Sequence, residues 1–213
     1  MSDRVKIICV FRSGRDYKAA YVENLKKALD RELKTDDWDM VCFTDVKLDI
    51  PGVEVQPFVL NLPGWWSKIE AFRYVGPCLY LDLDTLVISD FSPIFDRIRA
   101  LKDKQFLMLE PFNERQVWAS GVMAWNGDWS WLFTDFQHKD MAAVMDQKYI
   151  SKALMEFGAE IGSIQDNLKG IYSYKRHCKA SAPGDATLVC FHGKPRPHEI
   201  LWLKWVRRYW TGE

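Results

Sequence analysis

The first half of this chain alternates apolar runs with helix-like patterns, and this alternation restricts the fold more than any other feature. Strand-like runs cover 5–11, 40–43 and 53–58. A helix starting near Asp16 separates the first two runs, with apolar residues at helical spacing: Val22, Leu25, Leu29 and Leu33. Strands that alternate with helices are typical of a parallel sheet covered on both faces. The sequence therefore predicts an α/β fold with a mainly parallel central sheet flanked by helices.

Length and charge narrow the class of protein. A chain of 213 residues can bury one substantial core, so we expect a single domain over 1–213. Basic and acidic residues are equal in number, 29 of each, which argues against an extended nucleic-acid-binding surface. No apolar stretch approaches the ~20 residues that span a bilayer, and the first residues carry no signal-peptide pattern. The expected location is cytoplasmic.

The cysteines agree with that location. The chain has five, with no Cys-x-x-Cys spacing, and most lie inside apolar runs: Cys9, Cys42, Cys78, Cys178 and Cys190. An odd number of cysteines in strand-like segments is typical of buried free thiols in a reducing compartment.

Two carboxylates end the most apolar strand-like segment. The run Cys78–Leu81 is followed by Asp82-Leu83-Asp84. If the strand continued, Asp82 and Asp84 would project to the same side, with Leu83 opposite. Two neighbouring carboxylates favour a hard divalent cation, which predicts Mn²⁺ or Mg²⁺ and a diphosphate ligand. Most isolated Asp-x-Asp triplets are solvated turns, but active sites of open α/β sheets lie at such strand ends.

A second segment with candidate ligand-binding residues lies near the C-terminus. A short apolar strand at 188–191 leads into His192, Gly193 and Lys194. Glycine permits close approach of a ligand to the backbone, and lysine suits a phosphate. A histidine in this setting is more often a hydrogen-bonded structural residue than a metal ligand, so both interpretations stay open.

The aromatic residues and the C-terminal segment each allow two interpretations. Four tryptophans could form a sugar-stacking platform: Trp65, Trp66, Trp118 and Trp125. Aromatic residues at such spacings are more often part of the core. The segment 199–213 predicts a helix with aromatic residues on one face and basic residues nearby. It could make weak peripheral membrane contact, but docking onto the domain is the favoured interpretation.

Together these segments resemble the family 8 glycosyltransferases, the glycogenin and lipopolysaccharide galactosyltransferase relatives. The stretch 79–95, LYLDLDTLVISDFSPIF, is similar to the family's strand, Asp-x-Asp and serine-proline helix start. The stretch FHGKP at 191–195 resembles its closing His-x-Gly-x-x-Lys-Pro signature. WWSKIEAF at 65–72 and WASGVMAW at 118–125 resemble two further motifs, so the resemblance spans nearly the whole chain.

The resemblance implies a GT-A fold with one continuous sheet. Residues 1–90 would form the nucleotide-binding half and 91–198 the donor-sugar and acceptor half. It implies a metal-dependent, retaining transfer from a UDP-sugar to an unknown hydroxyl on a glycan, lipid-linked or protein acceptor. The implied metal ligands are Asp82, Asp84 and His192. The implied donor-binding residues are Lys68, Asp82, Leu83, Asp84, His192, Gly193 and Lys194.

The implied catalytic residues follow from a further motif. The family carries Asp-Gln where it contacts the transferred sugar, and the chain reads Ile164-Gln165-Asp166 in the segment compared with it. Gln165, with Asp166 in place of the missing aspartate, is therefore expected to stabilise the cationic sugar. Ala119 also stands where the family pattern has asparagine.

Two other functions stay open. A sugar nucleotidyltransferase would share the α/β core and the paired aspartates, but it needs a glycine-rich loop after the first strand, and residues 11–16 contain one glycine. A catalytically inactive nucleotide-sugar-binding protein is the second alternative, motivated by Ile164.

Overall fold

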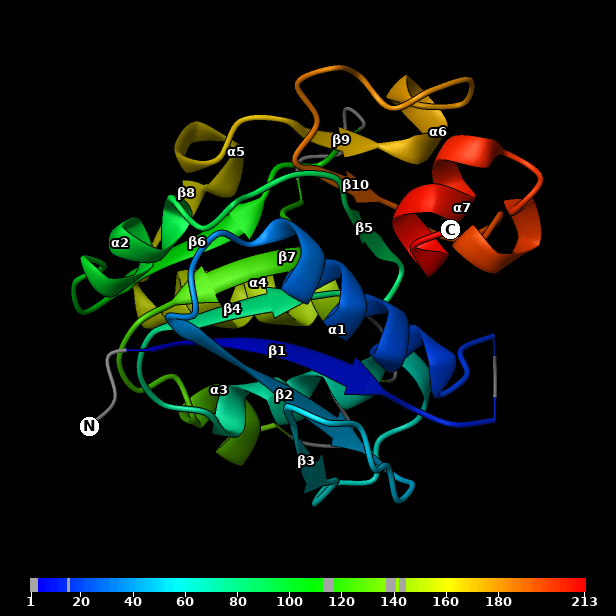
Figure 1. Cartoon of the computed structure of the whole chain (residues 1–213). Coiled ribbons are helices and arrows are strands. Elements are labelled where there is room, and N and C mark those ends of the chain that lie inside the picture. The colour runs from blue at the N-terminus through cyan, green and yellow to red at the C-terminus, as the bar shows by residue number, and fades with distance from the viewer. Residues whose placement is uncertain (1–3, 15, 113–116, 137–140, 142–144) are drawn as a thin grey trace.

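The computed structural model describes residues 4–14, 16–112, 117–136, 141 and 145–213 (Figure 1). Its centre is a seven-stranded sheet in the order β3-β2-β1-β4-β7-β6-β8. The strands are β1 (Val5–Phe11), β2 (Trp38–Thr44), β3 (Val53–Pro57), β4 (Cys78–Leu81), β6 (Gln105–Leu109), β7 (Ala119–Trp125) and β8 (Glu160–Ser163). β7 alone runs antiparallel to its neighbours in this sheet, while the other pairings are parallel. The predicted α/β fold with a mixed, mainly parallel sheet is confirmed.

A second, three-stranded sheet lies beside the first, in the order β5-β10-β9. Its strands are β5 (Thr85–Val87), β10 (Leu188–Cys190) and β9 (Ile171–Ser173). β10 pairs antiparallel with β5, so Cys190 lies opposite Thr85, directly after the two aspartates. The expected continuous sheet is the central one, in which β4 pairs with β7, and the additional small sheet brings the C-terminal segment next to the aspartates.

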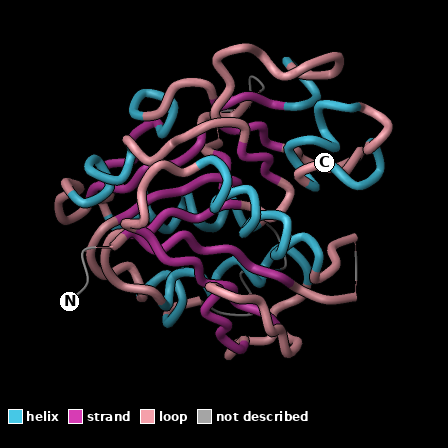
Figure 2. Tube along the Cα trace, in the orientation of Figure 1, coloured by secondary structure: helices cyan, strands magenta, loops and turns pink. Residues whose placement is uncertain are grey.

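Helices cover both faces of the central sheet (Figure 2). The described helices are α1 (Ala20–Glu32), the 3₁₀ helix η1 (Gly64–Arg73), α2 (Ile94–Arg99), α3 (Trp131–Thr134), α4 (Asp146–Phe157), α5 (Ile164–Asn167), α6 (Tyr174–His177), the 3₁₀ helix η3 (Pro197–Ile200) and α7 (Lys204–Thr211). Of these, α6 contacts β9 and α7 contacts β5, so both lie beside the small sheet.

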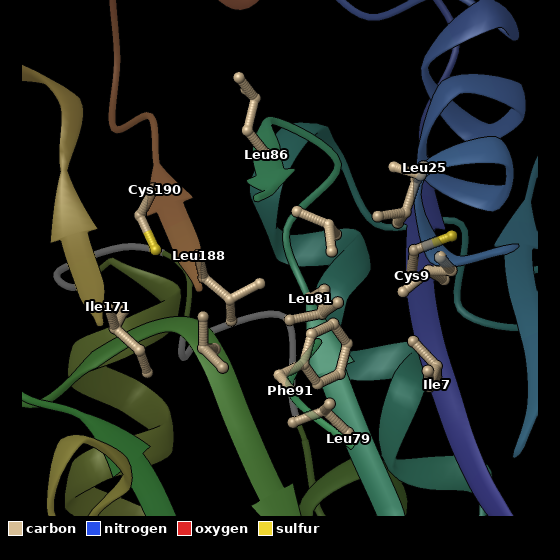
Figure 3. Close-up of a cluster of buried hydrophobic side chains, with 14 of the residues drawn as sticks. Ile7, Cys9, Leu25, Leu79, Leu81, Leu86, Phe91, Ile171, Leu188 and Cys190 are labelled. Atoms are coloured by element: carbon tan, nitrogen blue, oxygen red, sulfur yellow. The ribbon is translucent and has the colours of Figure 1, made fainter. Parts of the chain in front are cut away.

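The core forms on both faces because the strands are buried on both sides. In β1, Ile7 and Cys9 belong to the cluster beneath α1, whereas Ile8 belongs to the cluster beneath η1, α3 and α4. Figure 3 shows the first cluster, in which Leu25 of α1 lies near Cys9 and the side chains of the small sheet continue the same layer. This layer fixes the small sheet against the central one. All five cysteines are free and buried, as predicted.

The C-terminal helix α7 docks on α1. Val206 and Trp210 of α7 are buried, and the Trp210 ring centroid lies 4.5 Å from that of Tyr21. Trp202, another aromatic residue of the segment 199–213, is 75% exposed. The contact supports docking of the segment onto the domain. Among the described residues, no helix is both long and apolar enough to cross a membrane.

Candidate active site

A cavity of about 740 Å³ opens where β1, β4 and β6 end. Val10, Tyr80 and Leu109 lie at or near the carboxyl ends of these three strands and line the cavity. Ligands of open α/β sheets bind at this edge. The cavity also receives residues from the start of β7, from α4 and from the segment after β10.

The two aspartates lie in a turn between β4 and β5. β4 ends at Leu81, and the Thr85 amide donates to the Asp82 carbonyl at 3.0 Å. The expected strand alternation at Asp82, Leu83 and Asp84 is therefore wrong. All three nevertheless line the cavity, because the turn points into it.

Asp82 is the more exposed of the two carboxylates. Its Oδ1 accepts a hydrogen bond from the Tyr80 hydroxyl at 2.8 Å and lies 3.0 Å from Lys68 Nζ. Its Oδ2 faces the backbone of β7, where a Cβ added to Gly121 would lie 3.2 Å away. A glycine at this position thus leaves room for the carboxylate beside the strand.

Lys68 joins Asp82 to α4. Lys68 Nζ lies 3.2 Å from Asp146 Oδ2 and donates to the Ser120 hydroxyl at 2.9 Å, and that hydroxyl donates to Asp146 at 2.9 Å. Burial lowers the pKa of Lys68, but the Asp82 and Asp146 carboxylates outweigh it and raise the pKa above its ordinary value. Lys68 is therefore a fixed cation, and Asp146 is held by two donors.

Asp84 is buried, with 1% of its surface exposed, and two side chains hold it. The Tyr17 hydroxyl donates to its Oδ2 at 3.0 Å, and Arg196 Nη1 donates to the same oxygen. Burial and the neighbouring Asp82 raise the pKa of Asp84 to about 7, although Arg196 and Tyr17 lower it. The buried carboxylate thus already has a cationic partner from the segment after β10.

His192 and Gly193 lie on the wall formed by the small sheet and α6. His192 Nε2 is 2.6 Å from the Ser173 hydroxyl, and its ring stacks on Phe112. Burial, followed by the charges of Lys175 and Arg176, lowers the pKa of His192, which favours the neutral ring. Gly193 has a φ of +78°, and a Cβ added to it would lie 3.2 Å from the Lys175 ammonium.

Three of the predicted residues are placed elsewhere. The described cavity lining includes neither Gln165 nor Asp166 nor Lys194. Gln165 is paired with the Glu110 backbone, donating to its carbonyl at 3.2 Å and accepting from its amide at 2.9 Å. Lys194 is exposed and lies 3.3 Å from Glu199. The structure therefore brings together Lys68, Asp82, Leu83, Asp84, His192 and Gly193, and leaves these three outside.

The cavity contains residues that sequence reasoning missed, chiefly Asp146, Gln147 and Arg196. The sequence does contain a signal for Asp146 and Gln147, because these two residues form an intact copy of the Asp-Gln motif of the resembled family. The pair lies at the start of a segment with mixed charges, which is typical of a solvated helix. Arg196 carried no comparable signal, because its partner Asp84 is far away in sequence.

The tryptophans divide between the cavity and the core. Trp65 lines the cavity and is 58% exposed, whereas Trp66 and Trp125 are buried in the cluster beneath η1. Trp118 packs at the edge of the same cluster. The expected sugar platform is thus reduced to Trp65.

The residues present do not form a metal site in this arrangement. Among the described residues, no three His, Cys, Asp or Glu side chains lie close enough together to hold a metal ion. Asp84 forms an ion pair with Arg196, Asp82 forms one with Lys68, and His192 Nε2 is hydrogen-bonded to Ser173. The carboxylates and the imidazole are suitable ligand types for Mn²⁺, but they are not assembled around a common point.

No protein-family model matches the chain, and no curated protein matches it. Among solved structures, the galactosyltransferase LgtC, in complex with donor and acceptor sugar analogues, is 15% identical, with a TM-score of 0.66 over 96% of this chain and 93% of that one. An active-site mutant of LgtC is 12% identical, with a TM-score of 0.61 over 96% of this chain and 93% of that one. The glycosyltransferase GlyE of Streptococcus pneumoniae TIGR4 is 13% identical, with a TM-score of 0.63. The match covers 98% of this chain and 62% of the GlyE chain. The fold of this chain is therefore the GT-A fold of these glycosyltransferases, as the sequence resemblance predicted.

Proposed function

We propose that this chain is a glycosyltransferase that moves a sugar, with retention of configuration, from a UDP-sugar to a hydroxyl acceptor. One observation carries the proposal: the aspartate turn, His192 and Gly193 line a single cavity at the carboxyl edge of a GT-A sheet. The acceptor is a glycan, a lipid-linked sugar or a protein.

The diphosphate of the donor would bind along the wall that carries His192. Lys175, Arg176 and Arg196 all line this wall, and Gly193 lets the backbone approach a phosphate. The leaving nucleoside diphosphate develops negative charge as the sugar departs, and fixed cations stabilise that charge. Arg196 takes the role that the sequence assigned to Lys194, because its guanidinium lies inside the cavity.

The transferred sugar would lie toward α4, between Gln147 and the aspartate turn. Asp146 is tied to Lys68 and Ser120, so its carboxylate is a poor nucleophile. This pairing favours a front-face displacement, in which the acceptor attacks on the side of the leaving group and its proton passes to the departing diphosphate. The amide oxygen of Gln147 would stabilise positive charge on the sugar.

A divalent cation stays a prediction at this site. Mn²⁺ or Mg²⁺ would have to draw on Asp82, Asp84 and His192, and bound to them it would neutralise the diphosphate. No step above depends on it.

Calorimetric titration of UDP and a panel of UDP-sugars, with and without Mn²⁺, tests the donor site. We expect the wild-type chain to bind UDP and Asp82→Asn to bind it at least about tenfold more weakly, since the aspartate turn faces the donor. Asp166→Asn is the matched control, because Asp166 does not line the cavity. Absence of uridine-nucleotide binding under every condition would refute the proposed donor.

A further inference from the structure

A second cavity, of about 500 Å³, lies between α7 and the segment 181–186. α7 lies beside β5 (Figure 1), and Ile88 and Ser89, which follow β5, also line this second cavity. Thr85, the first residue of β5, lines the candidate active-site cavity instead. No described residue lines both cavities, so the second one is a separate place on the molecule.

The walls of the second cavity are fixed by the core. The Ile88 amide donates to the Thr187 carbonyl at 2.9 Å, and the Ser89 hydroxyl donates to the Ala186 carbonyl at 2.9 Å. On the opposite wall, the buried Val206 anchors α7. A ligand therefore meets a preformed surface and does not have to order it first.

The charge on the second cavity is positive. Lys204 and Arg208 are one turn apart on α7, both are exposed, and both line the cavity. No carboxylate from the described part of the chain lines it, and neither cation forms an ion pair with a described residue. Asp185, next to the lining segment, accepts a hydrogen bond from the Tyr172 hydroxyl at 2.9 Å instead. The two cations are thus free to bind an anionic ligand.

Aromatic rings lie between these cations. Trp205 and Tyr209 line the same face of α7, and the Arg208 guanidinium lies 5.5 Å from the Tyr209 ring centroid. The Trp205 ring packs against that of Tyr174, with their centroids 6.2 Å apart. Its indole Nε1 is buried and has no hydrogen-bond partner among the described residues. A ligand oxygen that accepted from this N–H would remove the cost of leaving a buried donor unpaired.

We propose that the second cavity binds a sugar that carries a phosphate or a carboxylate group. Lys204 and Arg208 would bind the anionic group, with the planar fork of Arg208 facing two of its oxygens. The rings of Trp205 and Tyr209 would pack on the apolar face of the sugar, and the hydroxyl of Ser89 would bind a sugar hydroxyl. This inference is independent of the proposed transfer, because no described residue of the active-site cavity takes part.

The test is a titration with glucose-6-phosphate, followed through the indole N–H signals in a proton–nitrogen correlation NMR spectrum. Trp205→Phe identifies the Trp205 signal, because it removes this N–H and keeps an aromatic ring. We expect glucose-6-phosphate and glucuronate to shift the Trp205 signal saturably. Glucose should bind at least about fivefold more weakly, because it lacks the charged group that the cations bind.

Three variants separate the second cavity from general charge effects. Arg208→Gln should weaken glucose-6-phosphate binding at least about fivefold, because it removes a charged hydrogen-bond donor. Arg207→Gln is the matched control and should change the affinity less than about twofold, since Arg207 is an exposed neighbour on the same helix that does not line the cavity. Arg176→Gln removes a cation from the active-site cavity and should leave the Trp205 shift unchanged.

Circular dichroism checks that each variant is folded, and Lys204→Gln carries the comparison if Arg208→Gln is not. Equal weakening in Arg207→Gln and Arg208→Gln, or loss of the Trp205 shift in Arg176→Gln, would overturn the proposal. So would a Trp205 signal that none of the sugars moves. If phosphatidylglycerol vesicles shift this signal and the charged sugars do not, α7 binds a lipid surface and the sugar site is refuted. Calorimetric binding of UDP reports on the other cavity, so either proposal can fail alone.

Discussion

Lys68 and Asp146 form a buried ion pair, with Nζ and Oδ2 3.2 Å apart, that joins η1 to the start of α4. The same ammonium lies 3.0 Å from Asp82. One lysine therefore positions the aspartate turn and the Asp-Gln pair relative to each other. A change at either end of this network should alter both stability and the geometry of the cavity.

Asp146→Asn should lower the free energy of unfolding by about 3 kcal/mol, the low end for a broken buried ion pair, because Asp82 still compensates Lys68. Urea unfolding followed by circular dichroism measures the change. Glu156→Gln is the matched control, since its pair with Lys152 is exposed at both ends and should contribute less than about 1 kcal/mol. Equal effects of the two variants would contradict the assigned burial.

Gln147→Ala should reduce the rate of sugar transfer by about a hundredfold, a usual loss when one polar group facing the reacting centre is removed. Gln165→Ala should leave the rate within about threefold, because Gln165 binds the Glu110 backbone outside the cavity. Both rates can be measured as UDP release from a UDP-sugar. A larger loss of rate in Gln165→Ala than in Gln147→Ala would instead support the catalytic role that the sequence resemblance implied for Gln165.

Trp210→Ala should destabilise the fold by about 3 to 5 kcal/mol, as usual for removal of a buried tryptophan. Trp202→Ala should change stability by less than about 0.5 kcal/mol, since its side chain is mostly solvated. Thermal unfolding compares the two variants, and liposome sedimentation tests the membrane alternative. If Trp202→Ala abolishes binding to anionic liposomes while Trp210→Ala stays fully stable, docking is not the role of the segment.

His192 should make stability decrease as the pH falls below about 6.5. Burial and the nearby cations lower the pKa of the folded imidazole, so the unfolded chain takes up the proton first. Protonation then favours unfolding, and above the ordinary histidine pKa the effect vanishes. His192→Gln should have a shallower pH dependence between about pH 7 and pH 5. Identical slopes for the two proteins would contradict the lowered pKa.

Periodic patterns explain why much of the fold could be predicted from the sequence. β4 is a continuous apolar run and β1 is interrupted only by Lys6, so the ends of these strands at Leu81 and Phe11 follow from the sequence pattern. The strand at 188–191 was predicted, but its pairing with β5 and β9 was not, because three-residue strands are too short to carry a pattern that identifies their neighbours.

The site was only partly predictable for a different reason. Asp82 and Asp84 stand out because two carboxylates interrupt an apolar run. Arg196 gains its role from a contact with Asp84, which only the pairing of β10 with β5 creates. Asp146 lies on a helix with mixed charges, where a buried acid looks the same in sequence as an exposed one.

The proposed enzyme transfers a sugar from a nucleotide-sugar donor bound in the cavity to an acceptor. The most direct measurement is release of UDP from a panel of UDP-sugars, with the sugar product identified by mass spectrometry, for wild type and Asp82→Asn. We predict sugar-dependent UDP release by the wild type and a loss of at least about a hundredfold in the variant. UDP release that is equal in the two proteins, or absent for every donor, would contradict the claim.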